Sequence, residues 1–214
     1  MEDLPAMTQA AVNLYDFDYT IYDGDCSLDF YRFCLRQKPL LLAYLPYQIL
    51  HFALYAMKLQ SRTSFKSKFF VFLCGVDDVA GSVEQFWNCH YVKIKKWYLV
   101  RDHASDVIIS ASPDFLLRTA FSKLKAHTLI ATDMSPRTGL ITGMNCRGDE
   151  KVKRFKKELG SSDVAEAYSD HRSDMPMLSL AKKSFFVIGE NIFSIQDYKN
   201  TTKFKVLLSK LRRD

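Results

Sequence analysis

The sequence is poor in the residues that mark fibrous, disordered or disulfide-linked proteins. Its 214 residues include eight glycines and six prolines, which form no low-complexity segment, and no internal repeat is visible. The five cysteines are odd in number and contain no Cys-x-x-Cys pair, which argues against a disulfide framework and a zinc site. Hydrophobic residues make up 48% of the chain, enough to bury a sizeable core. We therefore expect a globular protein with reduced thiols.

Acidic residues are missing from a long part of the chain. No Asp or Glu occurs between Phe30 and Val76, and residues 40–57 carry no charge and are almost entirely apolar. A membrane-spanning helix needs about 20 apolar residues, and Pro46 argues against an isolated crossing. Two interpretations stay open: peripheral contact with an anionic membrane through 40–57, or a buried helix with a solvated basic rim. Basic residues flank the apolar run at positions 32, 36, 38, 58, 62, 66 and 68.

The N-terminus and the net charge give two further expectations. Residues 1–5 are partly acidic and lack an apolar core, so we expect no secretory signal and a cytoplasmic protein, membrane-associated if 40–57 lies on a bilayer. The net charge of +6 is not joined to a recognisable nucleic-acid motif, and residues 203–214 predict a short amphipathic basic helix at most. We expect no nucleic-acid partner.

Two carboxylates stand directly after an apolar run near the N-terminus. Residues 10–15 are typical of a strand buried on both faces, and Asp16 and Asp18 follow it. Ligands of open parallel sheets bind at the carboxyl ends of the strands, so these two acids are candidates for a functional site. A solvated turn is the simpler explanation of this motif taken alone.

The same pattern recurs twice along the chain. Residues 106–109 lead into Ser110 and a helix that begins near Pro113, whose first turn offers unpaired N–H groups to an anion, although a simple capping serine has the same pattern. Residues 164–169 lead into Asp170, with Asp174 four residues later. Acids from the first and last of these strands are suited to a hard cation such as Mg²⁺, which prefers oxygen ligands.

Taken in order, these motifs resemble the haloacid dehalogenase superfamily of phosphohydrolases. The similarity is to the branch with a helical cap inserted after the first motif, which contains the phosphoserine phosphatases. Tyr19 and Ser169 stand where many members have glycine, and Thr20 would support the loop. The four family motifs, a nucleophilic Asp-x-Asp-x-Thr, a Ser or Thr after a strand, a Lys and an acidic loop, correspond here to Asp16–Thr20, Ser110, Lys151 and Asp170–Asp174.

The resemblance implies a catalytic role for several residues. Asp16 would be the nucleophile that takes the phosphoryl group, and Asp18 the acid that protonates the leaving oxygen and later activates water. Ser110, the Ala111 N–H and Lys151 would bind the phosphoryl oxygens. Three more lysines follow on the same predicted helix, at positions 153, 156 and 157. We prefer Lys151 because it stands at the start of that helix, near the sheet edge, and because residues 146–152 look like the third family motif.

The resemblance also implies Mg²⁺ as the cofactor. The ion would be held by Asp16, the backbone carbonyl of Asp18 and Asp170, with Asp174 ordering its waters or Lys151. It would neutralise the charge that otherwise repels an anionic nucleophile from an anionic phosphate.

The fold implied is α/β, with a three-layer Rossmann-like core around a parallel sheet and an inserted α-helical cap. About ninety residues separate the first two motifs and have a helical pattern. Residues 1–22 and 101–214 would form the core and residues 23–100 the cap. We predict core strands near 10–16, 106–110, 127–132, 164–169 and 184–188, core helices over 113–125 and 150–159, and a hairpin over 138–144.

Two helices are predicted within the cap. The first runs over residues 28–35, with Ser27 as its N-cap and Pro39 beyond its end. The second runs roughly from Val83 to Val100, and its aromatic stripe is interpreted as cap core rather than a cofactor site.

Two segments narrow the resemblance to the C-type phosphatidylglycerophosphatases, namely residues 33–40 and 144–152. That resemblance implies a phospholipid head-group phosphate as substrate, such as phosphatidylglycerophosphate. A small soluble ester such as phosphoserine is the alternative. Two other classes also stay open, a catalytically silent binding protein with the same fold and an enzyme that transfers the phosphoryl group to an acceptor other than water.

Overall fold

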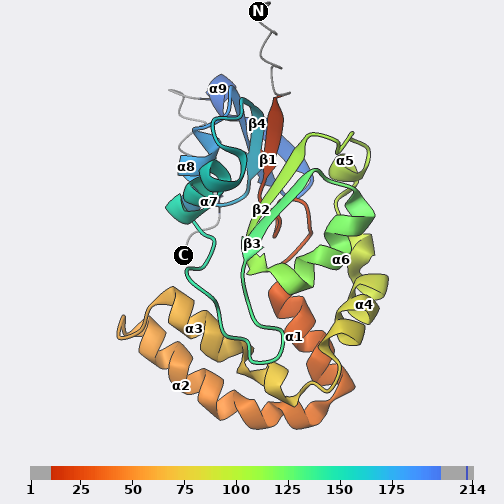
Figure 1. Cartoon of the computed structure of the whole chain (residues 1–214), viewed down its shortest axis with the longest axis vertical. Helices are drawn as coiled ribbons and strands as arrows, with labels where there is room; N and C mark the ends of the chain where they lie inside the picture. Colours follow the sequence, from red (N-terminus) through yellow and green to blue (C-terminus); the bar gives the residue numbers. More distant parts are fainter. Residues whose placement is uncertain (1–10, 199–210, 212–214) are drawn as a thin grey trace, which may run out of the picture.

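The computed structural model describes residues 11–198 and Leu211, which Figure 1 shows as an open sheet with helices on both faces. Within this part, six strands form one sheet in the order β3-β2-β1-β4-β5-β6. Strands β1 to β5 are parallel, and β6 is antiparallel to β5. The strands are β1 Val12–Tyr15, β2 Asp106–Pro113, β3 Thr128–Thr132, β4 Val164–Ser169, β5 Lys183–Ile188 and β6 Asn191–Ser194.

The helices fall into two groups along the chain. Those between β1 and β2, here called the inserted helices, are α1 Cys26–Gln37, η1 Pro39–Tyr44, α2 Leu45–Ala56, α3 Arg62–Phe69, η2 Phe70–Gly75, α4 Val79–His90, η3 Tyr91–Lys93 and α5 Lys96–Leu99, where η marks a 3₁₀ helix. Those after β2 are α6 Asp114–Leu124, α7 Asp149–Leu159, η4 Arg172–Asp174, α8 Met175–Leu178 and α9 Ile195–Tyr198.

Side chains of the central strands alternate between two buried clusters. Tyr15 and Ile108 pack with Leu116 of α6, whereas Leu14 packs on the other face with Phe155 of α7. Figure 1 accordingly shows α6 on one side of the sheet and α7 and α8 on the other. The predicted three-layer α/β core is confirmed.

The five predicted core strands all form, and one is longer than predicted. Strand β2 continues beyond Ser110 to Pro113, and its pairing with β3 is irregular between Ile109 and Pro113. The two predicted core helices also form, as α6 and α7. The carboxyl ends of β1, β2 and β4 therefore meet at one sheet edge, where the polar residues that follow them come together.

The N-cap predicted for the first inserted helix is wrong. Helix α1 begins at Cys26, and the Asp25 side chain accepts a hydrogen bond from the N–H of Leu28 at 2.9 Å. Ser27 lies inside the helix, where its hydroxyl contacts that of Ser112 at 2.9 Å. Asp25 and Ser27 are both good N-cap residues, and the structure places the first at the helix end.

The single helix predicted from Val83 to Val100 is also wrong. Helix α4 ends at His90, and the chain is irregular at Ile94 and Lys95 before α5. Ile94 pairs with Tyr22 in an antiparallel bridge, and the N–H of Lys95 donates to the carbonyl of Ile21 at 2.8 Å. These contacts with the loop after β1 replace the helical hydrogen bonds.

The hairpin predicted over residues 138–144 is shifted. The chain reverses earlier, with one antiparallel bridge between Met134 and Ile141 and no named strands. Gly139 adopts a φ of +72° in this loop, a conformation that favours glycine. The basic helix predicted over 203–214 lies outside the described residues, apart from Leu211.

Helices η1 and α2 carry an exposed apolar face. Among the described residues, Pro39–Ala56 is the one helical stretch long and apolar enough to cross a membrane, and 11% of it is buried. The buried-helix interpretation of residues 40–57 therefore does not hold. The apolar face, as we call it below, extends just past the end of α2 and consists of Leu40, Leu42, Leu45, Tyr47, Ile49, Leu50, Phe52, Met57 and Leu59.

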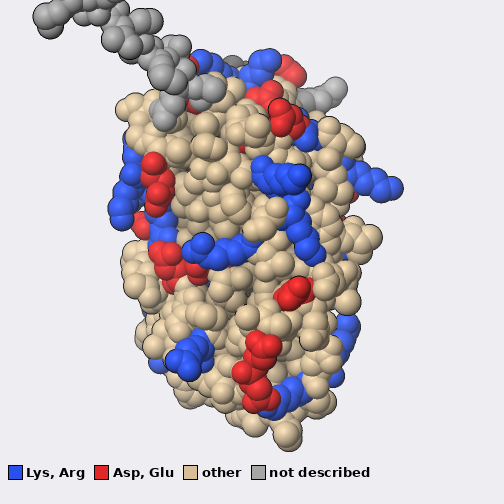
Figure 2. Space-filling view, turned by 45° about the vertical axis from the view of Figure 1, so that its right-hand side comes forward, with Lys and Arg blue, Asp and Glu red and all other residues tan. Residues whose placement is uncertain are grey.

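The apolar face lies far from the sheet. In Figure 1, α2 runs along the lower rim of the molecule, at the end opposite α9, on the outer side of α1 and α3. Figure 2 shows a view in which basic and acidic side chains are interspersed, with wide areas of other residues between them. The net positive charge is therefore not gathered into one patch on that side of the molecule.

Candidate active site

A cavity of about 450 Å³ lies between the sheet edge and the inserted helices. The core supplies carboxylates to its wall, among them Asp16 and Asp170. The inserted helices supply aromatic and basic side chains, among them Tyr55, Arg62 and Lys66. The core wall also carries Lys151 and Arg147, so it mixes acidic with basic groups, and the inserted helices add aromatic and basic side chains.

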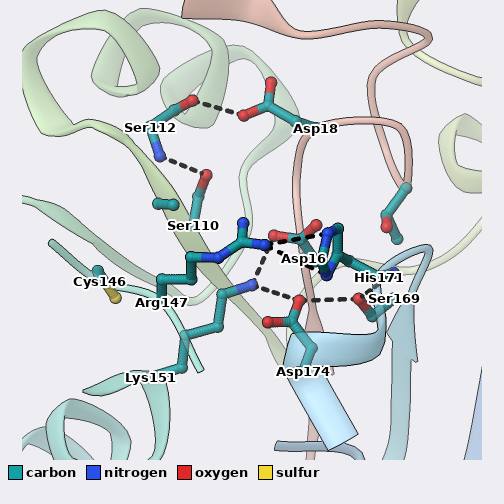
Figure 3. A network of polar contacts seen from close by, with 12 residues as sticks. Asp16, Asp18, Ser110, Ser112, Cys146, Arg147, Lys151, Ser169, His171 and Asp174 are labelled. Atoms are coloured by element: carbon teal, nitrogen blue, oxygen red, sulfur yellow. Dashed lines mark hydrogen bonds and ion pairs between the residues drawn. The ribbon is translucent and has the colours of Figure 1, made fainter. Parts of the chain in front are cut away.

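Lys151 joins two carboxylates at the base of this cavity. Its ammonium group lies 2.6 Å from Oδ1 of Asp16, directly after β1, and 2.7 Å from Oδ2 of Asp174, in η4 (Figure 3). Lys151 stands in the first turn of α7 and is 1% exposed. Oδ2 of Asp174 also accepts a hydrogen bond from the Ser169 hydroxyl at 2.8 Å.

Burial and charge oppose each other in this group. Burial raises the pKa of Asp16, against the opposing effect of the Lys151 ammonium. Burial would lower the pKa of Lys151, but the carboxylates of Asp16 and Asp174 together raise it. Lys151 is therefore a fixed cation, and it compensates part of the charge of the two acids that face it.

Asp18 points away from Lys151, toward the inserted helices. Its carboxylate accepts a hydrogen bond from the Cys26 N–H at 2.7 Å. It accepts a second one from the Ser112 hydroxyl at 2.5 Å (Figure 3). Burial raises the pKa of Asp18 to about 7, with a further rise from Asp25 and an opposing effect of the two hydrogen bonds. A carboxyl group with a pKa near neutrality can both donate and accept a proton under ordinary conditions.

Ser110 lies next to the cavity without lining it. It is fully buried and is not among the residues that line the cavity, and its hydroxyl accepts a hydrogen bond from the Ser112 N–H at 3.0 Å. Ala111 and Ser112 do line the cavity. The carbonyl of Ala111 accepts hydrogen bonds from Thr132 at 2.6 Å and from Lys66 at 2.5 Å.

Thr20 supports the loop, as predicted, and it does so by connecting the first motif to the last. Its hydroxyl accepts a hydrogen bond from the Asp170 N–H at 3.0 Å and donates to Oδ1 of Asp170 at 3.4 Å. Tyr19, where many members of the superfamily have glycine, has a φ of 59°. The loop thus keeps a left-handed backbone conformation that glycine adopts without strain.

Several cavity residues escaped the sequence analysis. They are Ser112, which holds Asp18; Lys66, on α3; and Arg147, whose guanidinium lies 3.0 Å from Nε2 of His171. Ser112 could have been suspected, because it stands two residues after Ser110. Lys66 had no local signal beyond the basic flank of the apolar run.

The donors at the sheet edge fit a magnesium ion. Asp16 and Asp170 are both buried carboxylates that line the cavity, and Asp18 follows Asp16 by two residues in the loop after β1. In residues 11–198, no group of three or more His, Cys, Asp or Glu side chains is arranged to hold a metal. Mg²⁺ retains waters and is commonly bound through one or two carboxylates, so a cage of side chains is not required.

Comparison with known families decides the assignment. The model of the haloacid dehalogenase-like hydrolases matches residues 14–179. The chain belongs to this family. The matched residues begin before Asp16 and end after Asp174, so the whole candidate site of this haloacid dehalogenase-like hydrolase lies within the family region.

Individual relatives cover different shares of the chain. The protein CicA of Caulobacter vibrioides (strain NA1000 / CB15N) is 34% identical over 91 residues, which cover 40% of this chain and 41% of CicA. A protein of unknown function from Bordetella pertussis Tohama I has a TM-score of 0.66 at 19% identity, covering 83% of this chain and 89% of that one.

A phosphoserine phosphohydrolase-like protein from Francisella tularensis subsp. tularensis SCHU S4 has a TM-score of 0.53 at 16% identity, covering 82% of this chain and 86% of that one. At these identities the two structural relatives show that the fold is shared. The chain spans less than half the length of the curated relatives it matches.

Proposed function

We propose that this hydrolase is a Mg²⁺-dependent phosphatase that cleaves a phosphate monoester through an aspartyl-phosphate on Asp16. The observation that carries the proposal is the placement of Asp16 in the cavity beside Lys151, with Asp18 two residues away and near neutrality in pKa. A nucleophilic carboxylate, a fixed cation and a proton carrier are the groups that such a reaction needs.

The reaction has two steps. In the first, a carboxylate oxygen of Asp16 attacks phosphorus, the bond from phosphorus to the leaving oxygen breaks, and protonated Asp18 gives its proton to that oxygen. In the second, ionised Asp18 takes a proton from water as the water oxygen attacks the phosphoaspartate, which releases phosphate and regenerates Asp16. Asp18 ends protonated, as it began, so protons balance over the cycle.

Other residues bind the transferred group. We assign Lys151 and the Ala111 N–H to the phosphoryl oxygens, with Ser110 beside them. Asp16, Asp170 and the backbone carbonyl of Asp18 are proposed to hold Mg²⁺, which when bound supplies positive charge that reduces repulsion between nucleophile and phosphate. Asp174 is the fourth acid proposed at the metal site. Its ion pair with Lys151 supports a role for Asp174 in positioning that lysine.

We further propose that the inserted helices act as a cap that gives the enzyme access to a phospholipid head group. The apolar face on η1 and α2 is exposed, and α2 also contributes Tyr55 to the cavity wall. Phe65 and Phe69 of α3 line the same cavity. One helix thus presents apolar side chains to the outside and an aromatic side chain to the site, which suits a substrate held at a membrane surface.

Phosphate release from a panel of esters tests the catalytic proposal. The panel contains phosphatidylglycerophosphate in mixed micelles, phosphoserine and sugar phosphates, with Mg²⁺ present, and Asp16→Asn is the blank. Release that depends on Mg²⁺ and Asp16 is expected, with preference for the lipid. Preference for a soluble ester would contradict the lipid assignment, and no release from any ester would favour a binding protein with this fold.

Vesicle binding tests the membrane contact separately. Sedimentation with anionic vesicles is expected for the wild type and lost in Ile49→Glu/Phe52→Glu, because both side chains are more than half exposed on the apolar face. Val100→Glu, which changes an even more exposed apolar residue outside that face, is the control. Equal binding of both variants would contradict the assignment of the apolar face to the membrane.

A further inference from the structure

Lys66 reaches into the cavity from α3 without a carboxylate partner. Its ammonium group donates to the carbonyl of Ala111 at 2.5 Å and to Oδ1 of Asn145 at 3.4 Å, and both acceptors are neutral. Within residues 11–198, no carboxylate makes an ion pair with Lys66. The side chain is partly buried, and burial lowers the pKa of Lys66 against the opposing effect of the nearby charges of Asp25 and Asp18.

The other cavity lysine is in the opposite situation. Lys151 contacts two carboxylates, so its charge is already balanced by the protein. Lys66 reaches the cavity from α3 and Lys151 from α7, so the two lysines come from different sides of the chain's fold. A partly buried cation beside neutral oxygens is stabilised when an anion enters next to it.

Arg62 brings a second cation to the same wall. It stands four residues before Lys66 on α3, a spacing that puts two side chains on one face of a helix, and both line the cavity. Its Nε donates to the Tyr55 hydroxyl at 3.0 Å, a contact that holds the guanidinium against α2. The two basic side chains therefore face the substrate space together.

We propose that Lys66 and Arg62 form a second anion-binding site, which holds an anionic group of the substrate other than the phosphate that is hydrolysed. The inference rests on the proposed phosphatase activity and narrows its substrate class to phosphate monoesters that carry a second anion. A phosphodiester, as in a phospholipid head group, and a carboxylate, as in phosphoserine, share this chemistry. A purely structural role, in which Lys66 only fastens α3 to the loop after Ser110, is the competing explanation.

Steady-state kinetics on three soluble esters separate these explanations. Glycerol 3-phosphate carries no second anion, phosphoserine carries a carboxylate, and glycerophosphoglycerol phosphate carries a phosphodiester. For Lys66→Gln we expect KM to rise about tenfold or more on an ester with the recognised second anion, because hydrogen bonds to charged groups contribute about that factor. KM for glycerol 3-phosphate should not change, kcat should change little on all three esters, and Lys66→Arg should restore the lost affinity.

The controls make each outcome decisive. Lys156→Gln removes an exposed lysine of α7, outside the cavity, and should match the wild type on every ester. An equal loss of kcat/KM on all three esters in Lys66→Gln would overturn the second anion site and favour the structural role. The ester whose KM responds identifies the anion as phosphodiester or carboxylate.

The wild type provides a test that does not depend on the folding of any variant. A KM at least about tenfold lower for one of the two-anion esters than for glycerol 3-phosphate is expected, and equal KM values for all three would overturn the inference. Absence of phosphate release from every ester would instead refute the proposed function itself. The two failures are therefore distinguishable.

Discussion

Replacing Lys151 by glutamine should strongly destabilise the fold. The Lys151 side chain is buried between the carboxylates of Asp16 and Asp174, at 2.6 and 2.7 Å. Removing one partner of a buried ion pair leaves uncompensated charge and costs about 3 to 5 kcal/mol. Typical domains have a total unfolding free energy of about 5 to 15 kcal/mol, so Lys151→Gln should fold but lose a large share of its stability.

The loss should grow as pH rises. Burial already raises the pKa of Asp16 in the presence of Lys151, and removing that cation raises it further. The unfolded-state pKa of an aspartate is about 4, and a carboxyl with a higher pKa in the folded state stabilises the fold while it is protonated. This stabilisation is lost as pH rises through the folded-state pKa. The difference from the wild type should therefore be smaller at mildly acidic pH than at neutral pH.

Urea unfolding followed by tryptophan fluorescence measures this difference, because Trp87 is fully buried in the native protein. Lys153→Gln, which removes an exposed lysine two residues further along α7, is the matched control. If Lys151→Gln unfolded at the same urea concentration as Lys153→Gln at both pH values, the assignment of Lys151 as a stabilising cation between two buried acids would be refuted.

Three further predictions concern the proton carrier, the metal and one glycine. Ser112→Ala should lower kcat about tenfold with little change in KM, because Asp18 loses a charge-assisted hydrogen bond, and Ser112→Thr should restore much of the loss; an unchanged kcat would contradict this role. Chelation of divalent ions should abolish phosphate release without changing the circular dichroism spectrum, and added Mg²⁺ should restore it; activity that survived chelation would argue against the metal. Gly139→Ala should cost more stability in thermal unfolding than Gly143→Ala, since both have positive φ but only at Gly139 would a Cβ overlap the Phe70 carbonyl; equal losses would exclude that overlap.

The sheet could be predicted from the sequence because its strands are short apolar runs that end in polar residues. Asp16 and Asp170 follow such runs, and the parallel arrangement brings them to one edge without further information. Lys151 was found through its position at the start of a helix together with the family motif. The ion pair between Lys151 and Asp174 depends on the conformation of the loop after β4. From the sequence, Asp174 had two possible roles, ordering the waters of the metal or ordering Lys151.

The rest of the site depends on contacts between distant parts of the chain. Lys66 and Ala111 are 45 positions apart, and Asp18 and Ser112 are 94 apart, so no local pattern joins them. The orientation of Asp18 and its raised pKa follow from burial under α1, which a sequence does not reveal. The break at Lys95 escaped prediction for the same reason, since its backbone N–H donates to the carbonyl of Ile21.

The most direct test of the account is to trap the phosphorylated enzyme. A rapid acid quench of the wild type with an ester labelled in its phosphate should give a protein-bound label that hydroxylamine releases, as expected for an acyl phosphate. Peptide mapping should place the label on Asp16, and Asp16→Asn should carry none. Turnover by the wild type with no labelled protein, or label on another residue, would contradict the proposed chemistry at Asp16.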